Sequence, residues 1–107
     1  MLDKGTVVNT VNRYASAVKK EFDPAAIILY GSYARGMARD DSDIDIAVIF
    51  NGFSGDWLKV SSRLWHLTED INYSIEPILL DSKHDPSGFV QNIFKTGQVI
   101  YQKQSMS

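Results

Sequence analysis

Three stretches of the chain repeat apolar residues with the period of an α-helix. The first is Thr6–Phe22, and Asp23-Pro24 ends it because a residue before proline disfavours helical torsions. A second helix is predicted over Asp56–Asp70, whose first residue is a suitable N-cap. A third is predicted over Pro86–Thr96, and Gly97 is the expected C-cap.

Shorter apolar runs separate these helices and are typical of β-strands. They are rich in β-branched residues and occupy Ala26–Tyr30, Asp43–Phe50, Tyr73–Leu80 and Val99–Gln102. Pro77 lies inside the third run, so that strand is expected at a sheet edge or at a bulge, where a missing N–H is tolerated. A short helical segment is predicted at Tyr33–Met37, directly after the first strand.

The order of these elements predicts the fold class. Helices interleaved with three or four strands indicate an α/β (α+β) fold, a small mixed sheet with helices packed on it. The 107 residues suffice for one compact domain. We therefore expect a single domain over residues 1–107, with a disordered tail from about residue 103.

Composition narrows the function classes. The chain contains no cysteine, which excludes a disulfide scaffold and a thiolate metal site. No apolar run approaches the roughly 18 residues needed to cross a bilayer, and the N-terminus lacks the apolar region of a signal peptide, so a cytoplasmic protein is expected. The net charge of -2 argues against direct nucleic-acid binding, but it is compatible with a single nucleotide held by metal ions.

Three acidic residues interrupt otherwise apolar strands. Asp43 and Asp45 are two positions apart and therefore point to the same face of a strand. Their charges repel unless a cation lies between them, and carboxylate oxygens favour Mg²⁺ or Mn²⁺. If Glu76 lies on a neighbouring strand, the three carboxylates could hold two metal ions. The alternatives are a solvated acidic pair and an exposed acid on an edge strand.

Gly31 and Ser32 stand between the first strand and the short helical segment. Glycine lets a ligand approach the backbone closely, and a helix N-terminus offers free N–H groups to anions. Ser32 adds a hydroxyl, so the pair is a candidate phosphate cradle; a simple helix cap is the alternative for Ser32. Arg35 and Arg39 lie on the same segment and are either phosphate ligands or solvated surface residues.

Two familiar motifs begin in this region but are incomplete. Residues 31–36 match the start of a P-loop, yet Met37 and Ala38 replace its lysine and hydroxyl residue. Residues 41–52 match the first ligands of an EF-hand loop but lack its glycine and its final glutamate.

Five other residues have side chains suited to chemistry or binding. Asp40 and Asp41 are expected to be solvated turn residues, and His66 and His84 to be structural or surface residues. Trp65 falls one position off the inner stripe of its helix, so we expect partial exposure and consider it the first candidate for a protein contact.

The stretch GSYARGMARDDSDIDIAVI, residues 31–49, resembles the signature of the DNA polymerase β-type nucleotidyltransferase superfamily. That signature is Gly-Ser, about ten residues, Asp-x-Asp within a strand, and a later acid on another strand. The short chain resembles the minimal nucleotidyltransferases, or MNT domains. Members are commonly encoded beside a HEPN-domain protein, and in some pairs the MNT protein transfers AMP from ATP to a HEPN toxin.

The resemblance implies a nucleotidyltransferase fold and a role for each motif residue. Gly31 and Ser32 would hold the nucleotide phosphates, and Asp43 and Asp45 would bind the metals. Glu76 stands where the family has its third catalytic carboxylate, more often an aspartate.

The expected function is therefore metal-dependent transfer of AMP from ATP to a hydroxyl acceptor, with two Mg²⁺ ions, or Mn²⁺, as cofactors. The expected acceptor lies on a partner HEPN protein, with this chain as the antitoxin. One alternative is a catalytically weak MNT domain that neutralises its partner by binding alone. Another is a transferase that acts on RNA or on an aminoglycoside-type acceptor. Homo-oligomers and hetero-oligomers are both compatible with the sequence.

Overall fold

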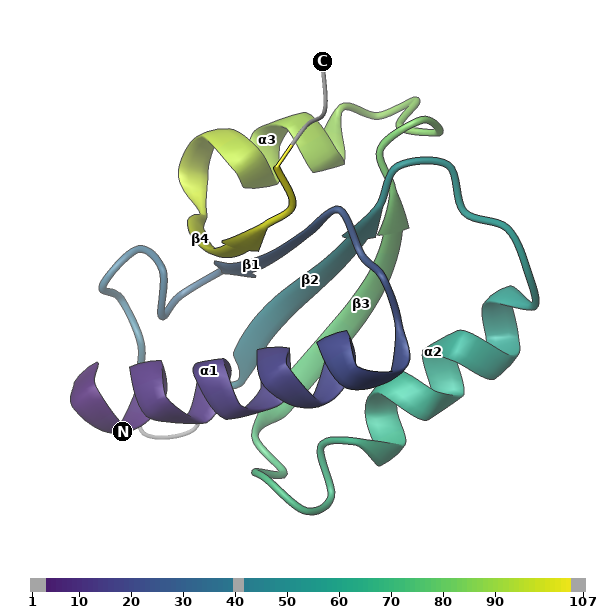
Figure 1. Ribbon diagram of the computed structural model, residues 1–107. Coiled ribbons are helices and arrows are strands. Elements are labelled where there is room, and N and C mark those ends of the chain that lie inside the picture. Colours follow the sequence, from purple (N-terminus) through teal and green to yellow (C-terminus); the bar gives the residue numbers. More distant parts are fainter. Residues whose placement is uncertain (1–3, 40–41, 105–107) are drawn as a thin grey trace.

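The computed structural model describes residues 4–39 and 42–104. Over these residues the chain forms three helices and four strands (Figure 1). In chain order they are α1 (Lys4–Glu21), β1 (Ala26–Tyr30), β2 (Ile44–Phe50), α2 (Trp57–His66), β3 (Ile75–Asp81), α3 (Phe89–Thr96) and β4 (Gln98–Gln102). The predicted α/β class, with helices packed on a small mixed sheet, is confirmed.

The strands form one sheet in the order β3-β2-β1-β4. β1 is antiparallel to both β2 and β4, whereas β2 and β3 are parallel and are joined through α2. Pro77 lies on the edge strand β3, as expected, and the register with β2 runs unbroken from Ile44↔Ile75 to Phe50↔Asp81. The irregularity in the sheet lies instead between β1 and β4, near Ile27 and Ile28.

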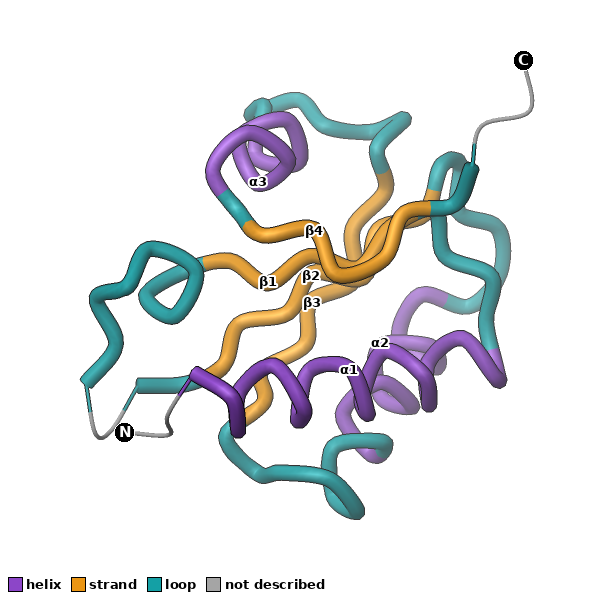
Figure 2. The backbone as a smooth tube through the Cα atoms, turned by 60° about the vertical axis from the view of Figure 1, so that its left-hand side comes forward, coloured by secondary structure: helices purple, strands orange, loops and turns teal. Residues whose placement is uncertain are grey.

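Helices cover both faces of this sheet. Figure 2 shows α1 and α2 on one side of the strands and α3 on the other. Ile44, Ile46 and Val48 of β2 are buried in the cluster that includes α1 and α2, whereas Ala47 and Ile49 are buried in the α3 cluster. A strand with two buried faces loses the alternation of polar and apolar residues, which explains the continuous apolar run in the sequence.

Helix α1 packs through a single buried stripe along its length, which consists of Val7, Val11, Tyr14, Ala15 and Val18. The buried hydroxyl of Tyr14 donates a hydrogen bond to the backbone carbonyl of Leu64 at 2.7 Å, and this bond joins α1 to α2. The predicted boundaries of this helix differ from the observed ones by one or two residues.

Helix α2 begins where predicted and ends earlier. The Asp56 carboxylate accepts a hydrogen bond from the Lys59 backbone N–H, which confirms the N-cap. The prediction that the helix reaches Asp70 is wrong. The Thr68 N–H bonds the carbonyl of Trp65, three residues back, and the Thr68 hydroxyl donates to the same carbonyl at 2.7 Å. These bonds replace the helical pattern with turns.

Helix α3 begins at Phe89 rather than at Pro86. The Asp85 carboxylate accepts hydrogen bonds from the backbone N–H groups of Val90 and Gln91, so it caps a shorter helix than predicted. Gly97 is the C-cap, as expected, although its φ of -85° is not left-handed. Glycine is needed there because a Cβ would lie 2.7 Å from Ile28 Cγ2.

The C-terminal segment is bonded to the residues before β1 through Lys103, the residue at which the sequence predicted disorder to begin. The Lys103 N–H donates to the carbonyl of Ala25 at 2.8 Å, and the Lys103 ammonium lies 2.6 Å from the Asp23 carboxylate. Residues 105–107 lie outside the described residues. No helix within the described part of the chain is long and apolar enough to cross a membrane.

Candidate functional site

Three side chains form a row across the sheet where β1 ends and β2 and β3 begin. Tyr30 of β1 is paired with Asp45 of β2, which is paired in turn with Glu76 of β3. Alternate residues of these strands, including Ala47 and Ile28, pack against α3, so the row lies on the α3 face of the sheet. Glu76 is therefore on the strand next to Asp45, as the three-carboxylate hypothesis required.

Asp43 lies one residue before β2, so the prediction that the strand begins at Asp43 is one residue too long. Its carboxyl nevertheless lies near Glu76. After lost hydration, the charge of Asp43 and a hydrogen bond that the protonated Glu76 carboxyl donates to Asp43 raise the pKa of Glu76. The fold thus gathers Asp43, Asp45 and Glu76 at one edge of the sheet.

The electrostatics of this group favour protons or cations. Partial burial, followed by the charge of Asp43, raises the pKa of Asp45 above its usual range. Lost hydration, followed by the charges of Asp43 and Asp45, raises the pKa of Glu76 as well, although its side chain is exposed. Carboxylates that raise one another's pKa are stabilised when a cation reduces their repulsion.

Gly31 is the point where the backbone comes closest to this group. Its φ is +75°, which glycine adopts without strain, and an added Cβ would lie 2.2 Å from Asp45 Oδ2. A side chain at position 31 would therefore occupy the space that the Asp45 carboxylate fills.

The predicted helical segment at Tyr33–Met37 is wrong, because residues 32–36 form turns. The Arg35 N–H bonds the Gly31 carbonyl at 3.2 Å, and Gly36 at φ +69° stops the turn from continuing as a helix. The backbone N–H groups of Ser32, Tyr33 and Ala34 form no hydrogen bond with another described residue. Successive free N–H groups after a left-handed residue form a concave site for an anion without requiring a helix.

The two arginines of this segment differ in position. The Arg35 guanidinium lies near enough to Asp45 for its charge to lower the pKa of that carboxyl, partly offsetting the effects that raise it. Arg39 is exposed, and its backbone N–H donates to the Ser42 hydroxyl at 2.7 Å. Its guanidinium makes no ion pair with a described residue. Only Arg35 is thus brought to the carboxylates by the described contacts.

The carboxylates fit a divalent metal by chemistry, since they offer only hard oxygen ligands in an excess of negative charge. Within residues 4–39 and 42–104, however, no three His, Cys, Asp or Glu side chains already converge around one point as ligands of a metal ion. A metal bound at this edge would be held by Asp43, Asp45 and Glu76 and would reduce the repulsion between their charges.

Sequence reasoning missed Tyr30. Burial, followed by the charges of Asp45 and Glu76, raises the pKa of Tyr30 to about 12. Its ring meets Phe89 of α3 edge-on, with ring centroids 6.0 Å apart. Only the strand register reveals its place beside the two acids, although its position directly before Gly31 was a usable signal.

A hollow of 240 Å³ adjoins the row where the end of β1 meets α3. It is lined by Tyr30, Gly31, Arg35, Asn92, Ile93 and Thr96. Tyr30 and Gly31 belong both to the row and to this hollow, so the two features are continuous.

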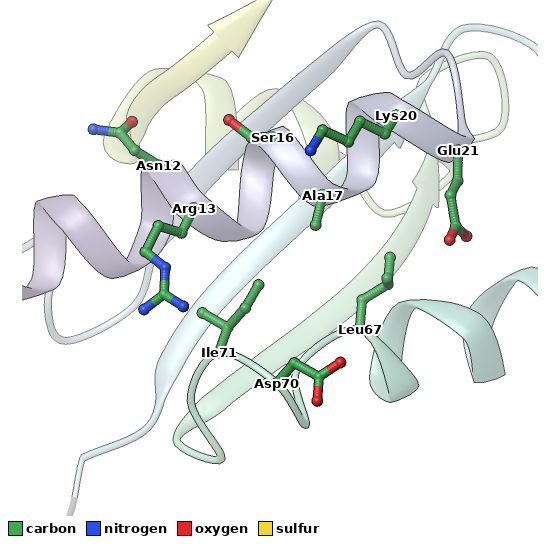
Figure 3. A pocket seen from close by; sticks show the side chains of 9 residues that line it. All are labelled: Asn12, Arg13, Ser16, Ala17, Lys20, Glu21, Leu67, Asp70 and Ile71. Atoms are coloured by element: carbon green, nitrogen blue, oxygen red, sulfur yellow. The ribbon is translucent and has the colours of Figure 1, made fainter.

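Larger hollows lie away from the carboxylates. One of 620 Å³ separates α1 from the turns after α2, where Leu67 and Ile71 face Ala17 (Figure 3). It lies on the sheet face opposite to the row, because α1 and α2 cover that face. Another, of 760 Å³, lies at the far end of β2, beside Phe50 and Lys103.

The remaining predicted residues lie outside the site. His66 is exposed and lies 3.1 Å from Glu69, and His84 is exposed in the loop after β3. Trp65 is 48% exposed, as expected, and its role in a protein contact stays a prediction. Asp40 and Asp41 lie outside the described residues.

Comparison with known families gives one match over most of the chain. The sequence profile of the family described as Polymerase beta, Nucleotidyltransferase matches residues 12–106. The chain therefore belongs to this family, as the resemblance implied. No curated protein sequence matches it significantly.

Solved structures share the fold at low sequence identity. A candidate nucleotidyltransferase from Sulfolobus solfataricus is 22% identical, with a TM-score of 0.64 over 91% of this chain and 81% of that one. A toxin–antitoxin complex with AMP-PNP contains a chain that is 21% identical, with a TM-score of 0.64 over 91% of this chain and 74% of that one.

A third structure is a mutant of the MntA–HpeT toxin–antitoxin complex, in which two aspartates two positions apart are replaced by glutamates. Its matching chain is 20% identical, with a TM-score of 0.64 over 87% of this chain and 73% of that one. These three structures confirm the nucleotidyltransferase fold.

Proposed function

We propose that this member of the polymerase beta nucleotidyltransferase family transfers AMP from ATP to a hydroxyl group on a partner protein, and so acts as the antitoxin of a toxin–antitoxin pair. The observation that carries the proposal is the carboxylate edge of the sheet. Asp45 and Glu76 are paired across parallel strands, Asp43 reaches Glu76, and the Gly31 backbone lies against Asp45. Acids and a phosphate cradle in contact suit chemistry on a nucleotide phosphate.

Each group has a proposed role in the reaction. Asp43, Asp45 and Glu76 would hold two Mg²⁺ ions, or Mn²⁺, which when bound polarise the phosphate oxygens and neutralise the leaving group. The free N–H groups after Gly31 and the hydroxyl of Ser32 hold the β- and γ-phosphates. Arg35, which already lies near Asp45, adds positive charge beside the phosphates. Arg39 is proposed as an outer phosphate contact.

The proposed transfer requires only these groups, ATP and one acceptor hydroxyl. The acceptor hydroxyl oxygen attacks the α-phosphorus of ATP, a new P–O bond forms, and the bond to the α,β-bridging oxygen breaks, so pyrophosphate leaves. Glu76 accepts the proton of the hydroxyl.

The solved relatives support the choice of nucleotide and acceptor. Two of them are toxin–antitoxin complexes, and one of these complexes contains AMP-PNP, an analogue of ATP. The mutated aspartates in the other have the spacing of Asp43 and Asp45. By analogy we propose ATP as the donor and a hydroxyl of a HEPN-domain partner as the acceptor.

The test is transfer of label from ATP labelled at the α-phosphate, with Mg²⁺ and the product of the adjacent gene. We expect Asp43→Asn and Asp45→Asn to reduce transfer at least 100-fold, on the order of what removing a key electrostatic group costs. Asp23→Asn is the matched control, because Asp23 is an exposed aspartate beside Lys103 at the other end of the sheet. Full metal-dependent transfer by the double variant at positions 43 and 45 would contradict the assignment.

A further inference from the structure

The proposed transfer assigns no ligand group to the hollow of 240 Å³ between the end of β1 and helix α3. The hollow shares Tyr30 and Gly31 with the carboxylate row and the phosphate cradle. In the proposed transfer the β- and γ-phosphates lie at Gly31 and the α-phosphate lies at the carboxylate row. The ribose follows the α-phosphate, so it would lie beside Tyr30, at the mouth of this hollow.

Two of the α3 side chains that line this hollow, Asn92 and Thr96, are polar and exposed. The Asn92 side-chain amide has no hydrogen-bond partner among residues 4–39 and 42–104. The Thr96 hydroxyl donates to the backbone carbonyl of Asn92 at 2.8 Å, which leaves its oxygen lone pairs free to accept. Asn92 can both donate and accept, so the two residues match a ligand that carries hydroxyl groups.

The size of the hollow and its walls decide which part of a nucleotide it fits. Pockets for whole small-molecule ligands usually measure about 300–1,000 Å³, so a hollow of 240 Å³ takes only a part. A base would need an aromatic face or an apolar slot, whereas the Tyr30 ring is engaged edge-on by Phe89. Ile93 is the one apolar side chain from α3 in the lining, and it is buried. The sugar is the better match.

We propose that this hollow binds the ribose of the nucleotide, with Asn92 and Thr96 contacting its 2′- and 3′-hydroxyl groups, and that the protein therefore selects ribonucleotides over dideoxyribonucleotides. The inference rests on the proposed function for the position of the phosphates. It assigns to α3 a specificity role that the carboxylate motif does not contain.

The test is the ratio of dissociation constants for ATP and 2′,3′-dideoxy-ATP, measured by calorimetry with the full chain and Mg²⁺. We expect the wild type to bind ATP about 10-fold more tightly, and Asn92→Ala or Thr96→Val to reduce this ratio about 3- to 10-fold, on the order of one lost hydrogen bond. Binding of dideoxy-ATP should change little. Gln91→Ala is the matched control, since Gln91 is exposed on the same helix and outside the lining.

Equal binding of both nucleotides by the wild type, or an unchanged ratio in both variants, would overturn the ribose assignment. Either result leaves the label-transfer test of the proposed function standing. Conversely, a ribose preference that depends on Asn92 but is accompanied by no AMP transfer would contradict the proposed function alone. Far-UV circular dichroism verifies folding of the variants, which we expect because both side chains are exposed.

Discussion

At the scale of single residues, Gly31 combines two requirements that no other residue type meets. Its φ of +75° lies in the left-handed region, and an added Cβ would lie 2.2 Å from Asp45 Oδ2. The clash is with the end of a side chain, so the Asp45 carboxylate can rotate away. A substitution at Gly31 should therefore damage the site more than the fold.

We expect Gly31→Ala to abolish AMP transfer while lowering the free energy of unfolding by about 1–2 kcal/mol, the cost of a left-handed φ in an L-residue. Gly36→Ala is the matched control, because Gly36 has φ +69° and an added Cβ would meet no atom within 4 Å. It should lose similar stability and keep most of its transfer. Denaturant unfolding measures the stability of the two variants, and the labelled-ATP assay measures their AMP transfer. Equal AMP transfer by the two variants would show that the close approach of position 31 to Asp45 does not matter for activity.

Without a bound metal, the charged Glu76 carboxylate lowers the free energy of unfolding at neutral pH. Its pKa is raised in the folded protein, so the folded state binds its proton more tightly than the unfolded state. Stability from this group is fully present below the unfolded pKa and is lost as the pH rises through the folded pKa. Removing the charge should therefore stabilise the chain at neutral pH.

We expect Glu76→Gln to raise Tm at pH 7 in the presence of a chelator and to have little effect at pH 4, while AMP transfer is lost. Glu69→Gln is the control, since Glu69 is exposed and lies beside His66, and it should give no increase. Thermal unfolding at the two pH values measures this. A lower Tm for Glu76→Gln at pH 7 would contradict the electrostatic description of the site.

At the scale of elements, the contact between α1 and α2 depends on one buried polar group. The Tyr14 hydroxyl donates to the Leu64 carbonyl at 2.7 Å within the core. Burial raises the Tyr14 pKa, so the hydroxyl stays protonated as a donor. Without it, the carbonyl loses this hydrogen bond inside the protein, where water is a poor substitute.

Tyr14→Phe should lower the free energy of unfolding by about 1–2 kcal/mol, equivalent to a decrease in Tm of roughly 5–10 °C for a chain of this length. Tyr73→Phe is the comparison, because Tyr73 is 82% exposed and its substitution should be nearly neutral. Thermal and denaturant unfolding of the two variants provide the measurement. Identical stabilities would mean that the bond between α1 and α2 contributes nothing.

Apolar periodicity predicted the elements, but it did not predict several of their ends. The period of 3.6 continues past His66 to Leu67 and Ile71, yet the hydrogen bonds of Thr68 end α2 earlier. The start of α3 is set by the hydrogen bonds of Asp85. These bonds depend on side-chain geometry rather than on hydrophobicity. The turn at residues 32–36 escaped prediction for a similar reason, because Gly36 at positive φ stops a helix that composition allows.

The residues of the candidate site also form two groups: those whose spacing is visible in the sequence, and those that only the fold brings together. Gly31, Ser32, Asp43 and Asp45 lie within one short segment, so their spacing was visible in the sequence. The adjacency of Glu76 was conditional until the parallel pairing of β2 and β3 was known. The place of Tyr30 beside the acids required the pairing of β1 with β2. The place of Asn92 and Thr96 beside the cradle required the packing of α3 on this face of the sheet. Long-range pairing carries this information, and local patterns do not.

At the scale of the whole molecule, the two faces of the sheet differ in how far helices cover them. α1 and α2 cover one face along the strands, whereas α3 covers the other and leaves the carboxylate row at its end. Glu76 and Asp43 are exposed, so the acids lie where a second protein can bring a hydroxyl group to them. An acceptor on a partner protein is thus compatible with the architecture.

The most direct measurement is the intact mass of the partner protein, encoded by the adjacent gene, after incubation with this chain, ATP and Mg²⁺. The account predicts that wild-type protein increases the partner's mass by one or more AMP units. It predicts no increase when Asp43→Asn and Asp45→Asn are combined or when the metal is chelated. A partner that stays unmodified while it binds wild-type and double-variant protein equally tightly would contradict the account and identify the chain as a neutraliser by binding alone.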